Sequence, residues 1–210
     1  MFGNVHSKRT RAFTLVELLV VVAVIGTLAA LYLPATNRAQ MKARQLQCLM
    51  NLHQAGLAFQ MFAQDHDTRY PMGVPVREGG SKEYAIQGQA FRHFQVMSNL
   101  LQQPRILLCP ADKLRHPAAS WSSLQNENLS SFVGLDAHPG RGDHLLAGDR
   151  NVTNQTVVSG TILFMTTNDI AGWTRNLHDR RGNVLFADGR VEQLNSEGLQ
   201  AALRKHGQYR

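Results

Sequence analysis

The sequence predicts an α+β fold in which a long N-terminal helix, half in a membrane and half amphipathic, packs on a small antiparallel sheet with accessory helices. The first observation behind this prediction is an apolar run, residues 13–33, which is 21 residues long and contains one charge, Glu17. The second is the helical spacing of apolar residues that continues to about residue 64. The third is a pair of strand-like runs around Asp188-Gly189, which predicts an antiparallel hairpin.

The apolar run has the length of a membrane-spanning helix. At about 1.5 Å per residue it would extend roughly 30 Å, the thickness of the bilayer hydrocarbon. Lys8, Arg9 and Arg11 precede it, with no acidic residue before Glu17, which predicts a cytoplasmic N-terminus and export of everything after the run. A secretory signal peptide has a shorter apolar core of roughly 7–15 residues. A generic anchor explains the length but not a carboxylate one turn into the helix.

The start of the run carries a recognisable motif. Behind the short basic leader, Ala12 is followed by Phe13-Thr14-Leu15-Val16-Glu17. In this pattern the chain resembles the type IV pilin and type II secretion pseudopilin superfamily, which usually has Gly at the position of Ala12. The resemblance implies that a prepilin peptidase cleaves between Ala12 and Phe13 and methylates the new amine of Phe13.

The resemblance also implies the organisation of the chain: a leader at 1–12, a transmembrane helix at 13–34, an amphipathic helix at 35–66 and a pilin-like α+β domain at 67–210. The expected function is that of a structural subunit of a type II secretion pseudopilus or a related type IV filament. Such a subunit crosses the bacterial inner membrane once, with its C-terminal domain outside the cytoplasm. Its expected partners are prepilin peptidase, other pilin or pseudopilin subunits and the inner-membrane secretion platform. A minor or competence-type pilin that binds DNA or polysaccharide is the alternative.

Glu17 is expected to act in assembly. A carboxylate in hydrocarbon is costly, and so is the amine that cleavage would create on Phe13, which stays cationic after methylation. Pairing the two between neighbouring subunits would relieve both costs and set the axial offset between the subunits. Pairing within one subunit would relieve the same costs without specifying assembly, and this is the competing interpretation.

After the membrane segment, Pro34 is expected to kink the helix or break it locally, because proline has no N–H and clashes with the preceding turn. The helix that follows is polar at first and then carries a broad apolar face, which predicts that it leaves the membrane and is buried in the domain. Its methionines are interpreted as core residues. The apolar residues form two stripes, Leu46, Met50, Leu57 and Met61 on one and Leu52, Ala55, Phe59 and Phe62 on the other.

Local patterns predict the elements of the C-terminal part. A helix is expected over 90–102, and Ser196 is expected to cap a last helix that ends at about His206. The Asp188-Gly189 hairpin is expected to use a type I′ turn, with positive φ at both residues. Strands are expected at 106–109, 129–135, 144–147, 161–165, 183–187 and 190–194.

Nine residues separate His178 from Asp188-Gly189. This spacing resembles the H-x9-DG signature of a large group of bacterial prepilin-like proteins, whose members are also similar to this chain around 48–52 and 109–112. We interpret the signature as structural, with Asp188-Gly189 as the turn and His178 at the end of the preceding strand or loop. Because some pseudopilins bind calcium near the C-terminus, a metal site made of His178, Asp179 and Asp188 is the alternative. Neither a calcium-loop pattern nor a zinc-type cluster supports it, so no cofactor is expected.

Cys48, on the long helix, and Cys109, at the end of a predicted strand, would both lie on the oxidising side of the membrane. We predict a disulfide between them that joins the helix to the sheet. Two buried free thiols are the alternative, because a sequence does not supply the separation of the two Cα atoms.

Charge and motifs indicate a structural protein rather than an enzyme, with a nucleic-acid partner not expected for the favoured function. Lys and Arg total 22 against 15 Asp and Glu, and without the three bases of the leader the balance is 19 against 15, or +4. No basic cluster is dense enough to predict a nucleic-acid partner, so a solvated basic surface is expected. The chain has no G-x-S-x-G, H-E-x-x-H or P-loop motif.

Overall fold

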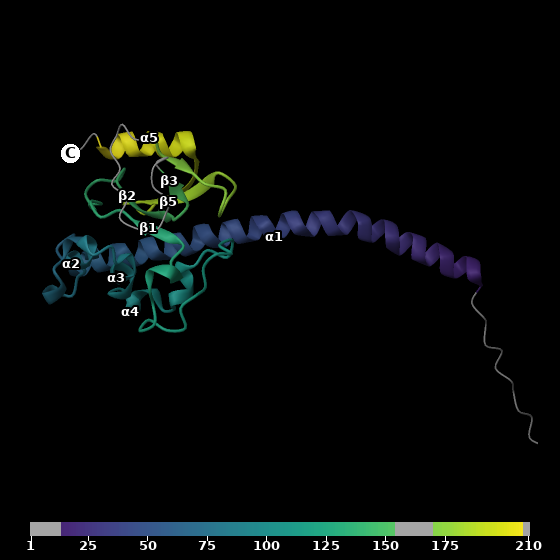
Figure 1. Ribbon diagram of the computed structural model, residues 1–210, viewed down its shortest axis with the longest axis horizontal. Helices are drawn as coiled ribbons and strands as arrows, with labels where there is room; N and C mark the ends of the chain where they lie inside the picture. The colour runs from purple at the N-terminus through teal and green to yellow at the C-terminus, as the bar shows by residue number, and fades with distance from the viewer. Residues whose placement is uncertain (1–13, 154–169, 208–210) are drawn as a thin grey trace, which may run out of the picture. The chain divides into compact units, whose positions relative to one another are not determined.

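The computed structural model describes residues 14–153 and 170–207 (Figure 1). The chain separates into two compact units, residues 1–42 and residues 43–210. The described part of the first unit is the beginning of helix α1 (Leu15–Asp65), and the second unit contains the rest of that helix, the sheet and the other helices. The predicted α+β class is confirmed.

Helix α1 is 51 residues long. Its stretch Leu15–Tyr32 is 18 residues long and apolar enough to cross a membrane, and no second helix of this kind occurs among the described residues. The helix continues through Pro34, so of the two expected outcomes, a kink or a local break, the break does not occur. Proline removes one backbone hydrogen bond, but the bonds on either side of it can hold the helix together. The hydroxyl of Thr36 also donates to the carbonyl of Tyr32 at 3.0 Å.

A four-stranded antiparallel sheet with the order β1-β2-β5-β6 is the centre of the second unit. A separate antiparallel ribbon pairs β3 with β4. All five residues of β2 are buried, so the segment predicted as a strand at 144–147 forms a central strand. The predicted strand at 161–165 lies outside the described residues. The strand bounds are β1 Ser131–Val133, β2 Leu145–Asp149, β3 Val152–Thr153, β4 Gly172–Trp173, β5 Arg181–Phe186 and β6 Val191–Asn195.

The sheet separates two hydrophobic cores. Successive side chains in a strand point to opposite faces, so Leu185 of β5 packs in the core with α1, whereas Val184 and Phe186 pack in the core with helix α5 (Ser196–Gly207). Helix α1 approaches the sheet closely at Gly56, where a Cβ atom would lie 2.7 Å from Cδ1 of Leu185. On the α1 side, one predicted stripe is buried, with Leu52, Ala55, Phe59 and Phe62 at most 5 % exposed.

Short helical turns connect α1 to the sheet, and two predictions fail there. The helix expected over 90–102 is two helices, because Met97 leaves helical geometry with φ −100° and ψ 19°. The strand expected at 106–109 begins as a 3-10 turn, because Pro104 supplies the fixed φ that starts such a turn. The prediction failed because a short apolar run does not distinguish a strand from a buried helical turn. The bounds are η1 Pro71–Gly73, η2 Val76–Glu78, α2 Lys82–Ile86, α3 Ala90–Gln95, α4 Ser98–Leu101, η3 Pro104–Leu107 and η4 Asn126–Asn128.

The C-terminal hairpin and helix are confirmed, with two local corrections. The turn has positive φ at Gly189 but not at Asp188, and the Gly189 N–H donates to the Phe186 carbonyl at 2.9 Å. The connection is therefore a three-residue loop with Gly in the left-handed region rather than a type I′ turn. Helix α5 is capped by Asn195, whose Oδ1 accepts from the Gly198 N–H at 2.8 Å. The predicted cap, Ser196, instead accepts from the Trp173 N–H at 3.1 Å.

Candidate functional site

The N-terminal segment holds the first candidate site. Ala12 and Phe13, the predicted cleavage pair, lie outside the described residues. Oε2 of Glu17 accepts from the backbone N–H of Thr14 at 2.9 Å and from its hydroxyl at 2.8 Å. The Thr14 hydroxyl oxygen in turn accepts from the Glu17 N–H at 3.2 Å. These reciprocal bonds form a capping box, which satisfies donors that the first turn of a helix leaves open.

The capping box gives Glu17 a structural role that the sequence interpretation did not include. The pattern Thr14-x-x-Glu17 before an apolar run is a recognised helix-start signal and could have predicted it. The carboxylate therefore stabilises the start of its own helix through Oε2. This role does not require a neighbouring subunit, and it is compatible with a further ion pair at the same carboxylate.

The second unit exposes an apolar stripe on α1. Leu46, Met50, Leu57 and Met61 are 55, 61, 48 and 50 % exposed, so the prediction that the methionines are core residues is wrong for this stripe. At 100° per residue, these side chains lie on the side of the helix opposite the buried stripe. The helix can bury only one of the two stripes against its own sheet. We call the exposed set Leu46, Met50, Leu57 and Met61 the apolar stripe.

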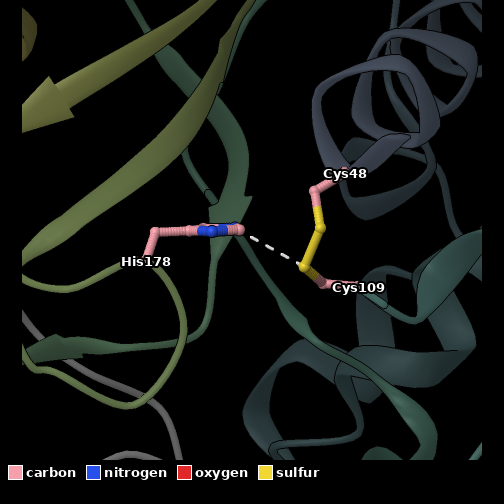
Figure 2. Close-up of side chains that lie close together, drawn as sticks. All are labelled: Cys48, Cys109 and His178. Atoms are coloured by element: carbon pink, nitrogen blue, oxygen red, sulfur yellow. Dashed lines mark hydrogen bonds between the residues drawn. A yellow bond between two sulfur atoms is a disulfide. The ribbon is translucent and has the colours of Figure 1, made fainter. Parts of the chain in front are cut away.

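A buried disulfide joins α1 to the loop after η3. Cys48 and Cys109 are bonded through their sulfur atoms, with their Cα atoms 5.0 Å apart (Figure 2). The two residues are 4 and 5 % exposed. The bond closes a loop across a sequence separation of 61 residues, and so connects the amphipathic helix to the segment that leads into the sheet.

His178 contacts the disulfide. Figure 2 shows its imidazole directed at Cys109, with Nε2 3.5 Å from Sγ. The same nitrogen lies 3.4 Å from Oδ2 of Asp149, at the end of β2. Burial raises the pKa of Asp149 to about 7 and lowers the pKa of His178, so the pair favours its uncharged forms. Oδ2 of Asp149 is further held by the backbone N–H and the side-chain amide of Asn183 at 2.7 and 3.0 Å.

A second buried carboxylate lies on the same loop. The turn from Cys109 to Asp112 is closed by the Asp112 N–H, which donates to the Cys109 carbonyl at 2.9 Å. Arg150 holds Asp112 with two bonds of 2.7 and 2.8 Å, and the Ser130 hydroxyl adds a third of 2.9 Å. Burial alone would raise the pKa of Asp112, but these hydrogen bonds and the guanidinium charge lower it below its ordinary value. The segment 109–112 therefore positions both a disulfide cysteine and a buried ion pair.

The two ends of the H-x9-DG spacing have different surroundings. His178 lies against the disulfide, whereas Asp188 binds Arg190 at 3.2 Å in the β5–β6 turn. The alternative metal site made of His178, Asp179 and Asp188 is therefore not brought together among the described residues. Asp188-Gly189 forms the turn as interpreted from the sequence, and His178 follows β4 in a loop whose next two residues, Asp179 and Arg180, have φ of 47° and 62°.

Comparisons with known proteins identify the N-terminal segment. Residues 7–33 match the family described as Prokaryotic N-terminal methylation motif. This motif marks type IV pilin-like prepilin proteins, which are processed by prepilin peptidase. Together with the apolar stretch Leu15–Tyr32, it marks a single-pass, membrane-anchored chain. Neither the curated proteins nor the solved structures contain a match to the chain.

Proposed function

We propose that the protein is a structural subunit of a type II secretion pseudopilus or a related type IV filament. The observation that carries this proposal is the methylation motif at 7–33, which implies processing by prepilin peptidase and assembly with other pilin subunits. Cleavage between Ala12 and Phe13 would place the Thr14–Glu17 capping box directly behind the new amine. The docking of the subunit on an inner-membrane secretion platform is part of the same proposal.

The apolar stripe supports an assembly role. A continuous helical face of four large apolar side chains, each about half exposed or more, is a common mark of a protein–protein contact. Helices that pack side by side bury such stripes against each other. We propose that the occupant of the apolar stripe is α1 of a neighbouring subunit, because the motif at the start of the same helix marks a family of filament subunits.

We further propose that the N-terminus is cytoplasmic and that the second unit lies outside the inner membrane. The three bases in front of the apolar run support this orientation, since cytoplasmic flanks carry an excess of Lys and Arg. The buried disulfide also supports it, because disulfides persist in oxidising compartments.

We propose a structural rather than an enzymatic role. Within residues 14–153 and 170–207, a hydroxyl–imidazole pair is found at Ser81, whose Oγ lies 2.8 Å from His93 Nδ1. Both residues are fully buried, and burial lowers the pKa of His93 to about 4. A nucleophile and its base must be reached by a substrate, so this pair is better explained as an interior hydrogen bond.

The test is a cysteine cross-linking experiment in intact cells. Leu57→Cys, in the apolar stripe, is expected to give covalent dimers within sheared filaments or pseudopili, whereas a cysteine at exposed Lys113 is the matched control and is expected to give none. Sheared material without the protein would contradict the filament proposal. Salt-dependent DNA binding, or polysaccharide binding, by the exported domain would favour the minor-pilin alternative instead.

A further inference from the structure

Three potential metal ligands meet inside the second unit. The sulfur atoms of Cys48 and Cys109 and a ring nitrogen of His178 all lie within 4.8 Å of one another, and all three residues are buried. Among the described residues, no other group of three such side chains is this close. They come from three separate segments, namely α1, the loop after η3 and the loop after β4. Figure 2 shows the imidazole facing the sulfur atoms.

The spacing of these atoms fits a tetrahedral site. With Zn–S near 2.3 Å and Zn–N near 2.0–2.1 Å, a sulfur and a nitrogen on the same ion are roughly 3.5 Å apart. Nε2 of His178 is 3.5 Å from Sγ of Cys109. Two sulfur atoms on one zinc ion are roughly 3.8 Å apart, so the separation of the two sulfurs has to increase when the disulfide opens, and Cys48 Sγ already lies within 4.8 Å of the imidazole.

The surroundings offer space and a further ligand. A cavity of about 10 Å³ is lined by both cysteines and by Asp149, next to Asn51 and Leu52. Oδ2 of Asp149 lies 3.4 Å from Nε2 of His178. This carboxylate is close enough to complete a four-coordinate site directly or through a water molecule. Two thiolates and an imidazole favour Zn²⁺ over calcium or magnesium, which take oxygen ligands.

We propose that the dithiol form of the protein binds one Zn²⁺ ion through Cys48, Cys109 and His178. The metal and the disulfide are then alternative links between α1 and the loop after η3. The disulfide form joins the two segments by a covalent bond, and the dithiol form joins them through the ion. The proposal does not depend on the filament function, since it rests on the second unit alone.

The change between the two forms is a two-electron reduction. With a phosphine as the reductant, the S–S bond breaks, each sulfur gains a proton, and the phosphine takes up the oxygen of one water molecule to become a phosphine oxide. A dithiol protein could act in the same way by forming its own disulfide. Zinc then binds the two thiolates, and their two protons are released to solvent.

The experiment uses the full chain in detergent, reduced with a phosphine, and Co²⁺ as a spectroscopic probe for the zinc site. We expect the reduced protein to bind one Co²⁺ with sulfur-to-metal charge-transfer bands and tetrahedral visible bands, and one equivalent of Zn²⁺ to remove them. The oxidised protein is expected to show neither. His178→Asn should weaken binding at least as much as the roughly 10–100-fold typical for loss of a supporting residue. His116→Ala, at an exposed histidine, is the matched control and should bind as the wild type does.

Thermal unfolding of oxidised His178→Asn shows whether this variant still folds. Cys48→Ser removes one thiolate ligand and is a second, independent test of metal binding. The proposal is overturned if the reduced wild type binds no Co²⁺ with charge-transfer bands. It is also overturned if the oxidised form binds equally well, or if a folded His178→Asn or Cys48→Ser variant keeps wild-type affinity.

Discussion

At the scale of single residues, Glu17 has one observed role, the helix cap, and one proposed role, an ion pair in assembly, which a substitution series can separate. Its Oε2 accepts two bonds from Thr14, and this caps the helix. Its negative charge, in contrast, is available to a cation such as the amine that cleavage would create on Phe13. A neutral amide can take over the first role but not the second.

Substitution of Glu17 therefore distinguishes the cap from the charge. Glu17→Gln keeps an acceptor for the Thr14 N–H, while Glu17→Ala removes it and should weaken the helix start. We expect both variants to insert and to be cleaved, and both to fall sharply in filament incorporation, because the charge is lost in each. Mass spectrometry of the N-terminal peptide and immunoblots of sheared filaments measure the two steps. Normal incorporation of Glu17→Gln would show that the cap, and not the charge, is what assembly requires.

His93 predicts a pH dependence of stability. Burial lowers its pKa from 6.5 to about 4, so between these pH values the unfolded chain binds a proton that the folded chain does not. The stability that depends on neutral His93 is fully present above pH 6.5. As the pH falls towards 4, the free energy of unfolding decreases by on the order of 3 kcal/mol. His93→Gln should remove this slope in urea unfolding from pH 4 to 7. The comparison must be made between variant and wild type, because Asp149, with its pKa raised to about 7, contributes stability that is lost as the pH rises. If the difference in free energy of unfolding between His93→Gln and wild type stays constant from pH 4 to 7, His93 is not the source of the pH dependence.

Removal of one partner from the buried pair Asp112–Arg150 is expected to cause a large loss of stability. The side chain of Asp112 is 0 % exposed and that of Arg150 10 %. Arg150→Met leaves a buried carboxylate without its main partner and should lower the free energy of unfolding by roughly 3–5 kcal/mol. The double variant Asp112→Leu with Arg150→Met removes both charges and should recover part of that loss. Denaturant unfolding measures both, and a double variant as unstable as the single one would contradict the charge-based explanation.

At the scale of elements, α1 carries two apolar stripes with different fates. One stripe packs against Leu185 and its neighbours in the sheet, and the other is exposed in the second unit. Periodicity shows that a stripe exists but not what covers it, because one helix has two long faces and one sheet can cover only one of them. The exposed face is therefore the part of the element that is available to a partner.

A charge placed in the apolar stripe should separate folding from assembly. Leu57 is 48 % exposed, so Leu57→Glu should leave the thermal unfolding temperature of the isolated subunit nearly unchanged. Burial of the new carboxylate against a neighbouring helix would be costly, so filament incorporation should fall strongly. Gln54→Glu, at an exposed polar position of the same helix, adds the same charge without removing an apolar group and is the control. Equal incorporation of both variants would show that the apolar stripe is not an assembly contact.

At the scale of the whole molecule, the disulfide connects parts of the fold that are distant in the sequence. It closes a separation of 61 residues, for which the chain-entropy model gives roughly 4 kcal/mol of stabilisation. The paired variant Cys48→Ser with Cys109→Ser should therefore lower the free energy of unfolding by about this amount in metal-free buffer. Denaturant unfolding with a chelator present measures it. A loss well below 1 kcal/mol would show that packing alone holds α1 on the sheet.

The sequence by itself predicted the α+β class of the chain and contained its prepilin-type N-terminal motif. The apolar run, the basic leader and the Phe-Thr-Leu-x-Glu context are contiguous, and so are the hairpin around Asp188-Gly189 and the last helix. Local patterns such as these report local structure, because their causes lie within a few residues. Thr14-x-x-Glu17 belongs to the same group and was readable as a cap.

Only the tertiary structure decided which groups meet and which faces are covered. The contact of His178 with the disulfide joins segments 69 residues apart, and the Asp112–Arg150 pair joins segments 38 apart. Such contacts depend on the sheet order β1-β2-β5-β6, which the sequence does not contain in any local pattern. The same is true of the exposed apolar stripe and of the turn at 104–107, where the three-dimensional environment decides between structures that local propensity leaves nearly equal.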